Sequence, residues 1–388
     1  MRASPMLQVV VLWLAGLGAA AQFSKVGVIF EHIARVYPAA GEVALGLVVS
    51  IVGFAGLLFG TTAGLLVQRL GYRRVLVTAM AAGAILSCLQ ALLPPLPAML
   101  ALRAIEGVAH LAIVVAAPVM IAQTAPAARQ GLAMTLWSSF FAVSFAVTAW
   151  IGRPLVAAFG IPPLFLIHAL YMAGCALLLR ALLPADTPER PSRLALGTLV
   201  RQHGEIYASA RVAAPAIGFF CYTLVYVALL TLLPPMTDHA GLLASAMPLT
   251  SIAVSMTLGV WLLGRVTAVS MVQGGFAGAI VAMLLLWTVW GHQPAMLAAA
   301  LLLAGALGLV QGASFAAIPQ LNPDREGRTR AAGAVAQLGN LGTTSGTPLL
   351  AALLAAQGLP GLVLFIILPA AAGIGLHQWL SARRRANA

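Results

Sequence analysis

The chain has 388 residues, of which 61% are hydrophobic and 8% are charged, and its mean hydropathy is +1.00. This composition is too apolar for a soluble globular protein and indicates an integral membrane protein. The net charge of +12 does not indicate a nucleic-acid partner, because nearly all arginines fall on one side of the predicted spans and only Arg35 clearly lies on the other. We therefore expect the chain to be surrounded by a lipid bilayer and to bind no nucleic acid.

Apolar runs long enough to cross a bilayer recur from one end of the sequence to the other. A spanning helix needs ~20 mainly apolar residues. The sequence predicts twelve such helices, at about residues 7–30, 43–67, 75–94, 98–122, 132–152, 158–182, 212–235, 242–264, 268–290, 295–319, 332–356 and 360–380. Together with the arginine bias, this pattern predicts a multi-pass protein of the cell inner membrane with both termini in the cytoplasm.

The first apolar run also resembles a signal peptide, because Arg2 precedes an apolar core that ends in the small residues of 18–22, GAAAQ. We expect it to be retained as a helix, since the apolar pattern continues to Phe30 and the arginine bias requires this span. The three cysteines lie in separate spans without metal-ligand spacing, so we expect small core residues, no metal and no other cofactor.

Ionisable side chains inside the first and fourth spans are the main candidates for a functional site. Gln22 and Lys25, the only lysine, lie on one face of the first predicted helix, and Arg103, Glu106 and His110 form one stripe on the fourth. A charge at the bilayer centre costs ~2.5 to 3.5 kcal/mol on insertion scales, so such groups face a helix bundle or a water-filled cavity. The alternative is an ion pair that only locks helices together.

These groups suggest a division of roles. Lys25 and Arg103 offer positive charge to an anionic group of a substrate, with Gln22 as a hydrogen-bonding neighbour. Glu106 can alternate between carrying a proton and pairing with a base, aided by His110. From the depth of the residues along their helices, Lys25 and Glu106 can lie opposite each other, which would pair both charges.

A basic turn separates the second and third spans. Its sequence over 64–74 is GLLVQRLGYRR, in which Gly64 would permit close helix contact, Gly71 a tight turn, and Arg69, Arg73 and Arg74 would lie at the cytoplasmic headgroups. The alternative to a gating role is a basic turn that only fixes the topology.

The longest polar interruption divides the chain into halves of similar length. We expect an N-terminal six-helix bundle over 1–184, a cytoplasmic linker over 185–209 and a C-terminal six-helix bundle over 210–388. The halves echo each other weakly, because the pattern Q-x-x-P at 123–126 recurs at 320–323, which suggests a tandem duplication.

The spans of the second half carry neutral polar stripes instead of charges. Tyr222 and Tyr226 share a face of the seventh helix, and Gln311 and Ser314 share a face of the tenth. These four residues are candidate hydrogen-bonding partners of a substrate. A third stripe, Gln337, Asn340 and Thr344, lies among small residues in the eleventh helix, where we favour helix packing.

The helix count, the two halves and the loop at 64–74 resemble the Major Facilitator Superfamily, whose loop signature is G-x-L-x-D-R-x-G-R-R. Gln68 replaces the aspartate and Tyr72 one arginine, so residue 68 can still hydrogen-bond but cannot supply the negative charge of the family's contact across this loop. The sequence of the fourth helix is similar to the intramembrane Arg motif of that family. The resemblance implies an all-α fold of two six-helix bundles, with the first, fourth, seventh and tenth helices lining the cavity.

The resemblance implies a secondary transporter that works by alternating access, and Glu106 suggests proton coupling. The expected partners are protons and a small organic solute, anionic or zwitterionic, and we expect a monomer. An exporter of drugs, siderophores or other metabolites is the alternative, although Arg153 interrupts the glycine-proline pattern that antiporters carry in the fifth helix. A membrane-embedded enzyme using Glu106 and His110 is disfavoured because no nucleophile or metal-ligand set accompanies them.

Overall fold

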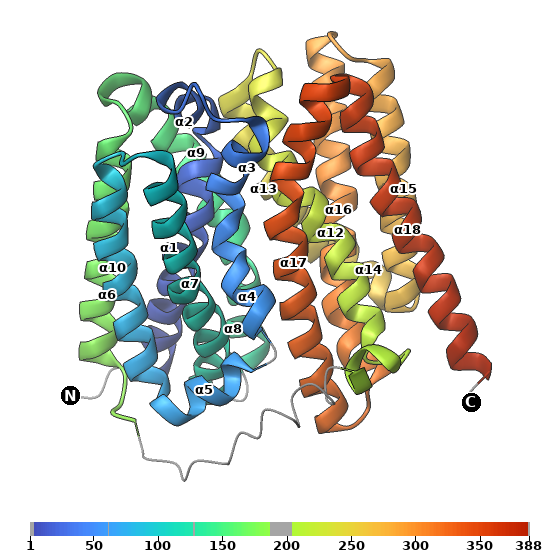
Figure 1. Cartoon of the computed structure of the whole chain (residues 1–388). Coiled ribbons are helices and arrows are strands. Elements are labelled where there is room, and N and C mark those ends of the chain that lie inside the picture. The colour runs from blue at the N-terminus through green and yellow to red at the C-terminus, as the bar shows by residue number, and fades with distance from the viewer. Residues whose placement is uncertain (1–3, 61, 127–128, 187–203, 387–388) are drawn as a thin grey trace. The chain divides into compact units, whose positions relative to one another are not determined.

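The computed structural model describes residues 4–60, 62–126, 129–186 and 204–386 of the chain. The chain forms two compact units, Met1–Pro191 and Ser192–Ala388, and every element in the described residues is helical (Figure 1). The boundary between the units falls in the range 185–209 expected as a linker, of which 187–203 lie outside the described residues. The expected assignment of 1–184 and 210–388 to two six-helix bundles stays a prediction.

The first unit is built from long helices and short helical pieces that interrupt them. In chain order these are α1 (Pro5–Gly27), α2 (Phe30–Val36), α3 (Glu42–Ser50), η1 (Ile51–Gly53), α4 (Phe54–Phe59), α5 (Ala63–Leu70), α6 (Tyr72–Ala91), α7 (Leu96–Thr124), α8 (Gln130–Ser138), α9 (Phe140–Phe159) and α10 (Pro162–Leu182).

The second unit has the same character. Its elements are α12 (Ala213–Leu232), η3 (Pro234–Met236), α13 (Ala240–Val254), the π-helical η4 (Ser255–Gly259), α14 (Val260–Leu263), α15 (Ala268–Thr288), α16 (Gln293–Leu321), α17 (Arg325–Gln357) and α18 (Leu359–Ala386).

Eleven helical stretches of the described chain are long and apolar enough to cross a membrane. In a bilayer the backbone polar groups of each span must be satisfied internally, and a helix does this within one segment. α17, which covers the predicted span 332–356, is longer than any of them but is not among the eleven. Its middle carries Gln337, Asn340, Thr343 and Thr344, which lower its hydropathy. The protein is therefore an all-helical membrane protein, whose described residues form eleven apolar stretches and a twelfth, more polar helix.

The fifth predicted span differs most from the structure. The sequence predicts 132–152, whereas the helix breaks at Ser139 into α8 and α9, and the long apolar helix is Phe140–Phe159. The Ser139 hydroxyl donates to Leu136 O at 2.7 Å and accepts from the Trp13 indole at 3.3 Å. Hydropathy does not register such a break, because the residues on both sides of it are apolar.

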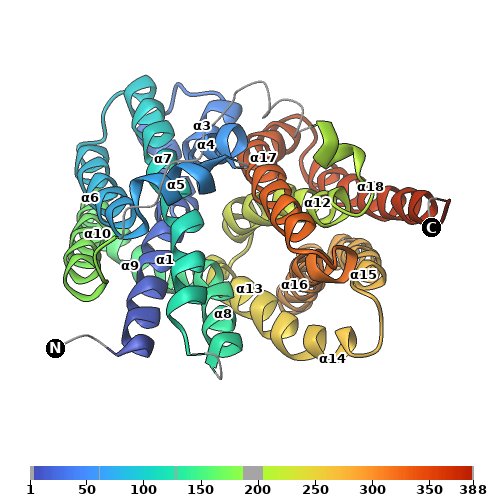
Figure 2. The same cartoon turned by 90° about the horizontal axis from the view of Figure 1, so that it is seen from below.

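Helix α1 is the element around which the first unit packs. It contacts α7, α9 and α10, while α6 packs against α7 and α10 (Figure 2). Side chains of the three neighbouring helices donate to carbonyl oxygens along α1. The donors and acceptors are Tyr171 to Leu14 at 2.8 Å, Ser144 to Leu17 at 2.9 Å, His168 to Gly18 at 3.1 Å, His110 to Ala19 at 3.0 Å and Arg103 to Gln22 at 2.6 Å.

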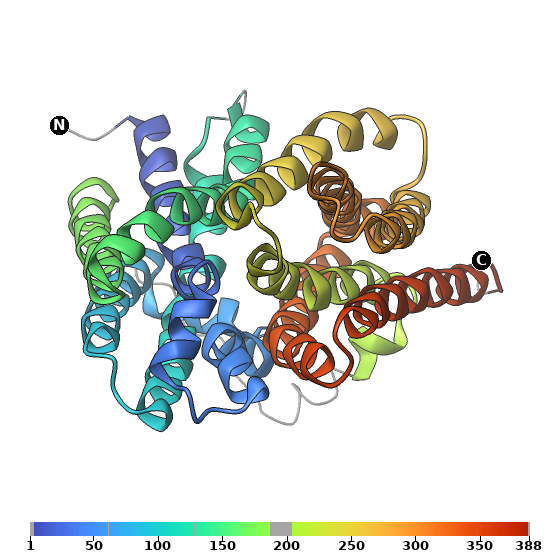
Figure 3. The same ribbon diagram turned by 90° about the horizontal axis from the view of Figure 1, so that it is seen from above.

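In the second unit α12 packs most closely against α17 and also against α16 and α18, and α15 lies beside α16 and α18 (Figure 3). A Cβ atom at Gly342 or Gly346 would collide with the backbone of α12 near Leu224. These two glycines let the helices approach closely. This contact agrees with the packing role favoured for the small and polar residues of this segment.

Candidate functional site

The carboxylate of Glu106 is the centre of a fully buried polar cluster in the first unit. One oxygen, Oε1, lies 2.8 Å from the Lys25 ammonium. The other, Oε2, accepts from Arg103 Nη1 at 2.5 Å and from the Gln90 amide at 2.8 Å. None of these four side chains is more than 1% exposed. The carboxylate therefore joins α1, α6 and α7 through two cations and an amide.

Lys25 uses all three of its N–H donors. Besides Glu106, its Nζ donates to Ser87 Oγ at 3.0 Å and lies 3.2 Å from His168 Nδ1. The His168 Nε2 atom faces the carbonyl of Gly18 and donates to it. The Nδ1 atom faces the Lys25 ammonium, which can only donate, so Nδ1 accepts and the ring is neutral. The ammonium also lies 4.9 Å from the centre of the Phe165 ring.

Arg103 is held by backbone carbonyls as well as by Glu106. Its Nε donates to Val48 O at 2.7 Å and its Nη2 to Val49 O at 2.9 Å, near the point where α3 gives way to η1. The last carbonyls of a helix lack intrahelical partners, so they can accept from a guanidinium. Arg103 therefore fixes the junction of α3 and η1 against α7.

The structure contains the Lys25–Glu106 pair expected from helix depth, and it adds partners that the sequence analysis missed. Ser87 and Gln90 lie three residues apart on α6, and His168 lies on α10. The spacing of Ser87 and Gln90 inside an apolar span is the signal that could have identified them. The roles of the cluster in transport stay predictions.

His110 and Gln22 lie beside the cluster without contacting the carboxylate. The His110 ring, 7% exposed, donates to Ala19 O and packs edge-on against Phe23 with 5.1 Å between ring centres. The Gln22 side chain is completely buried, and neither its amide nitrogen nor its oxygen has a hydrogen-bond partner. The oxygen of the Gln90 amide also lacks one. The amide of Gln22 and the amide oxygen of Gln90, in or next to the cluster, therefore have hydrogen-bonding groups that no described residue satisfies.

The polar stripes of the second unit are also buried. Tyr222 and Tyr226 are 3% and 2% exposed and stack with 4.9 Å between ring centres. Ser314 is completely buried on α16, whereas Gln311 is half-buried. The structure thus pairs the two tyrosines with each other, and the proposed contacts of all four residues with a solute stay predictions.

The loop between α5 and α6 turns at Gly71, which has a φ of +92°. The carboxylate of Asp186, just beyond the end of α10, accepts from the backbone N–H groups of Arg73 and Arg74 at 2.9 Å each. A Cβ atom at Gly71 would collide with this carboxylate. Asp186 therefore caps the first turn of α6 and brings a carboxylate to a loop in which Gln68 replaces the expected aspartate.

One expectation for an individual residue was wrong. Gly64 does not make a close helix contact, because a Cβ atom there would meet no described atom within 4 Å. Arg153, the residue that interrupts the glycine-proline pattern of α9, has partners within the first unit: its guanidinium donates to Val28 O at 2.8 Å and pairs with Glu31 at 2.7 Å. The ion pair of Glu31 and Arg153 therefore joins α2 to α9.

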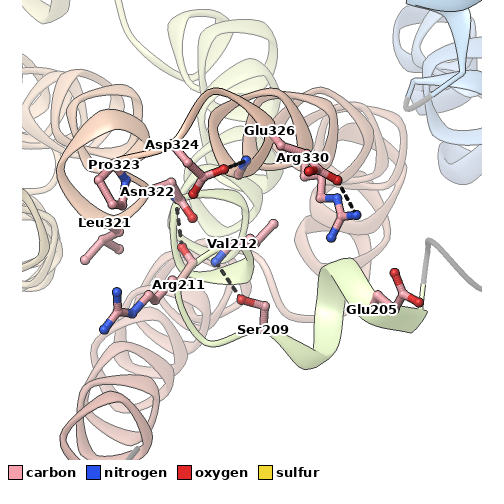
Figure 4. Close-up of a pocket in the computed structure, with 11 residues that line it drawn as sticks. Glu205, Ser209, Arg211, Val212, Leu321, Asn322, Pro323, Asp324, Glu326 and Arg330 are labelled. Atoms are coloured by element: carbon pink, nitrogen blue, oxygen red, sulfur yellow. Dashed lines mark hydrogen bonds and ion pairs between the residues drawn. The ribbon is translucent and has the colours of Figure 1, made fainter. Parts of the chain in front are cut away.

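An open pocket of about 300 Å³ lies in the second unit, where the start of α12 meets the turn between α16 and α17 (Figure 4). None of the residues predicted as site residues lines it. Its polar lining includes Ser209, Arg211, Asn322, Asp324, Glu326 and Arg330. These side chains are bound mainly to the backbone and to each other, as in the Arg330–Glu326 pair at 2.6 Å.

Comparison with family models identifies one family. A family model described as Major Facilitator Superfamily matches residues 12–347. Among solved structures 287 chains match, including a crystal structure of the E. coli fucose:proton symporter FucP. This structure shares 17% sequence identity, covers 97% of this chain and 99% of its own, and superposes with a TM-score of 0.65. No curated protein sequence matches the chain.

Proposed function

Because the chain belongs to the Major Facilitator Superfamily and is therefore a multi-pass secondary transporter and not an enzyme, we propose that it moves a small anionic or zwitterionic solute and that protons drive this movement. We further propose that it does so in the cell inner membrane, with both termini in the cytoplasm. The observation that carries this proposal is the charge balance around Glu106.

Cations outnumber carboxylates in the buried cluster. Lys25 and Arg103 both contact Glu106, and the described residues place no second carboxylate in contact with either cation. The neighbouring His168 is neutral, so the cluster keeps one uncompensated positive charge. An unpaired charge deep in a membrane protein is costly. A solute carboxylate or another anionic group would compensate it.

This arrangement makes protonation and solute binding mutually supportive. A proton on Glu106 removes the negative charge that Lys25 and Arg103 now share, which leaves both cations available for an anionic solute. A bound anion in turn lowers the cost of neutralising Glu106, because the cations stay paired. Such reciprocal effects are the thermodynamic basis of coupling between two ligands.

Neighbouring groups would orient the solute. The unpartnered amide of Gln22 can donate and accept next to the charge cluster. His110 lies one turn from Glu106 on α7 and would assist proton transfer. In the second unit Tyr222, Tyr226, Gln311 and Ser314 would supply neutral hydrogen bonds. The loop residues Gly64, Gln68, Arg69, Gly71, Arg73 and Arg74 would control the conformational change, and the Asp186 carboxylate would hold this loop through the N–H groups of Arg73 and Arg74.

The similarity to a fucose:proton symporter supports proton coupling, although 17% identity shows only that the fold is shared. The charge balance favours an anionic or zwitterionic solute over a neutral sugar. Proton coupling and the anionic nature of the solute can be tested separately, because coupling depends on Glu106 and the choice of solute depends on the excess cation.

The experiment begins with a thermal-shift screen of the purified protein against organic acids and amino acids. The solute that stabilises the protein most is then used in proteoliposomes. We expect Glu106→Gln to abolish accumulation driven by a pH gradient and to retain exchange of internal for external solute. The matched control, Glu42→Gln, changes an exposed carboxylate at the start of α3 and should transport like the wild type. Unchanged uphill transport in Glu106→Gln would remove Glu106 from the mechanism.

A further inference from the structure

Three residues on three helices of the second unit surround a buried polar spot, and of these three the proposed mechanism uses only Ser314. They are Gly218 on α12, Ser314 on α16 and His377 on α18, and both polar side chains are 0% exposed. The Ser314 hydroxyl and both ring nitrogens of His377 have no hydrogen-bond partner within the described chain. Buried donors and acceptors are nearly always paired in proteins, so these three atoms point to a missing ligand.

The space between these groups depends on the glycine. A Cβ atom at Gly218 would lie 2.8 Å from His377 Nε2 and 2.9 Å from Ser314 Oγ. Both polar atoms therefore converge on the same small region beside α12. The third neighbour of this position is the apolar Cγ1 of Val272 on α15, at 3.3 Å. A side chain here would collide with both polar atoms, so the glycine keeps carbon away from them and leaves their hydrogen-bonding edges to a small group that contacts His377 and Ser314 together.

The charges around this spot favour a neutral ligand. Neither α15 nor α16 carries an ionisable residue, and α12 contributes only Cys221 and tyrosines. On α18 the nearest charged group is the cation Arg384, two turns from His377. No carboxylate on these helices could pair with a protonated imidazole. His377 is therefore neutral and offers one N–H donor and one acceptor nitrogen, which match the donor and acceptor of a hydroxyl.

We propose that Gly218, Ser314 and His377 form a buried binding site for one neutral hydroxyl group, either an internal water molecule or a hydroxyl of a solute. This site lies within the second unit and does not depend on the charge cluster of the first. A water that makes two or more hydrogen bonds in a polar cavity is a regular part of folded proteins. The same contacts would hold an alcohol group in its place.

Hydroxyl-radical footprinting of the full chain in nanodiscs tests the water source, because a bound water allows oxidation of a side chain that bulk solvent does not reach. We expect His377 to be oxidised several-fold faster than His168. His168 is a matched control: it is 5% exposed, and both of its ring nitrogens have partners. Gly218→Ala should suppress the oxidation of His377, since the added methyl group would press against both polar atoms of the site.

The control for this variant is Gly274→Ala on α15, where an added Cβ meets nothing within 4 Å and the oxidation of His377 should not change. Ser314→Ala removes one ligand without adding bulk, and it should also lower the oxidation of His377. This variant replaces Gly218→Ala as the test if Gly218→Ala does not fold.

For the solute source, glycerol, L-fucose and L-lactate are used as probes in thermal-shift measurements. Stabilisation by one of them that Ser314→Ala abolishes would assign the site to a solute hydroxyl. A His377 as unreactive as His168, together with no Ser314-dependent stabilisation, would overturn the proposal.

Discussion

The ammonium of Lys25 and the carboxylate of Glu106 lie 2.8 Å apart at the centre of the first unit, and both are sealed from solvent. Arg103 contacts the same carboxylate. Loss of Glu106 would therefore leave two cations unpaired, whereas loss of Lys25 would leave the Arg103–Glu106 pair intact. This asymmetry allows the cluster to be tested without knowledge of the solute.

Removing the carboxylate should destabilise the protein more than removing the lysine. Glu106→Gln leaves two buried cations without a counter-ion, and breaking a buried pair in this way costs about 3–5 kcal/mol. Lys25→Met leaves the Arg103–Glu106 pair intact and should cost clearly less. Chemical unfolding in detergent measures both, with Glu42→Gln as a control that changes an exposed carboxylate. Equal losses for Glu106→Gln and Lys25→Met would mean that the excess charge is absent.

An anionic solute should restore part of the stability lost in Glu106→Gln. In this variant residue 106 is neutral, as it is when Glu106 carries a proton, so Lys25 and Arg103 lack their counter-ion. The thermal shift caused by the solute should therefore be larger in Glu106→Gln than in the wild type. A smaller shift in the variant would contradict the idea that proton and anion support each other's binding.

Arg103→Lys should not behave as a conservative change. The guanidinium donates to Glu106 and to the carbonyls of Gln22, Val48 and Val49, and an ammonium cannot reach all four in that planar arrangement. Leaving buried acceptors unpaired should cost about 2–4 kcal/mol in the free energy of unfolding. The control Arg35→Lys, at an exposed arginine near the end of α2, should stay within about 0.5 kcal/mol of the wild type.

The cap that Asp186 provides for α6 should be measurable in a double-mutant cycle. Asp186→Ala should cost about 0.5–2 kcal/mol, the usual value of a lost N-terminal cap. Gly71→Ala should also destabilise, because it strains a positive φ and displaces the Asp186 carboxylate. Once Asp186 is alanine, part of the second cost should disappear. Strict additivity of the two changes would show that the carboxylate and the glycine turn are independent.

Asp324 should make the second unit acid-sensitive. Its carboxylate caps α17 by accepting from Gly327 N at 2.7 Å, and this hydrogen bond lowers the pKa of Asp324 below its ordinary value. A pKa lowered by folding stabilises the folded state above the unfolded pKa and loses this effect as the pH falls through the folded pKa. The stability difference between wild type and Asp324→Asn should therefore shrink below about pH 4. A difference that does not change with pH would exclude this cap as the cause.

Much of the architecture could be predicted because membrane-spanning helices can be recognised in a sequence by their length and hydropathy. The charged stripe on α7 was also visible, since Arg103 and Glu106 are close in sequence and out of place in an apolar helix. Ser87, Gln90 and His168 were not assigned to it, because which faces of α6 and α10 meet α1 is decided by packing and not by any local pattern. For the same reason Asp186, distant in sequence from Gly71, could not be recognised as its partner.

The carbonyl acceptors along α1, from Leu14 to Gln22, limit how the first unit can respond to a ligand. Three surrounding helices are pinned to successive turns of one backbone. An axial slide of α1 by a single residue would break these attachments simultaneously. Whatever binds near Lys25 must therefore be accommodated by rearranged side chains, or by α1, α7, α9 and α10 travelling together as one body.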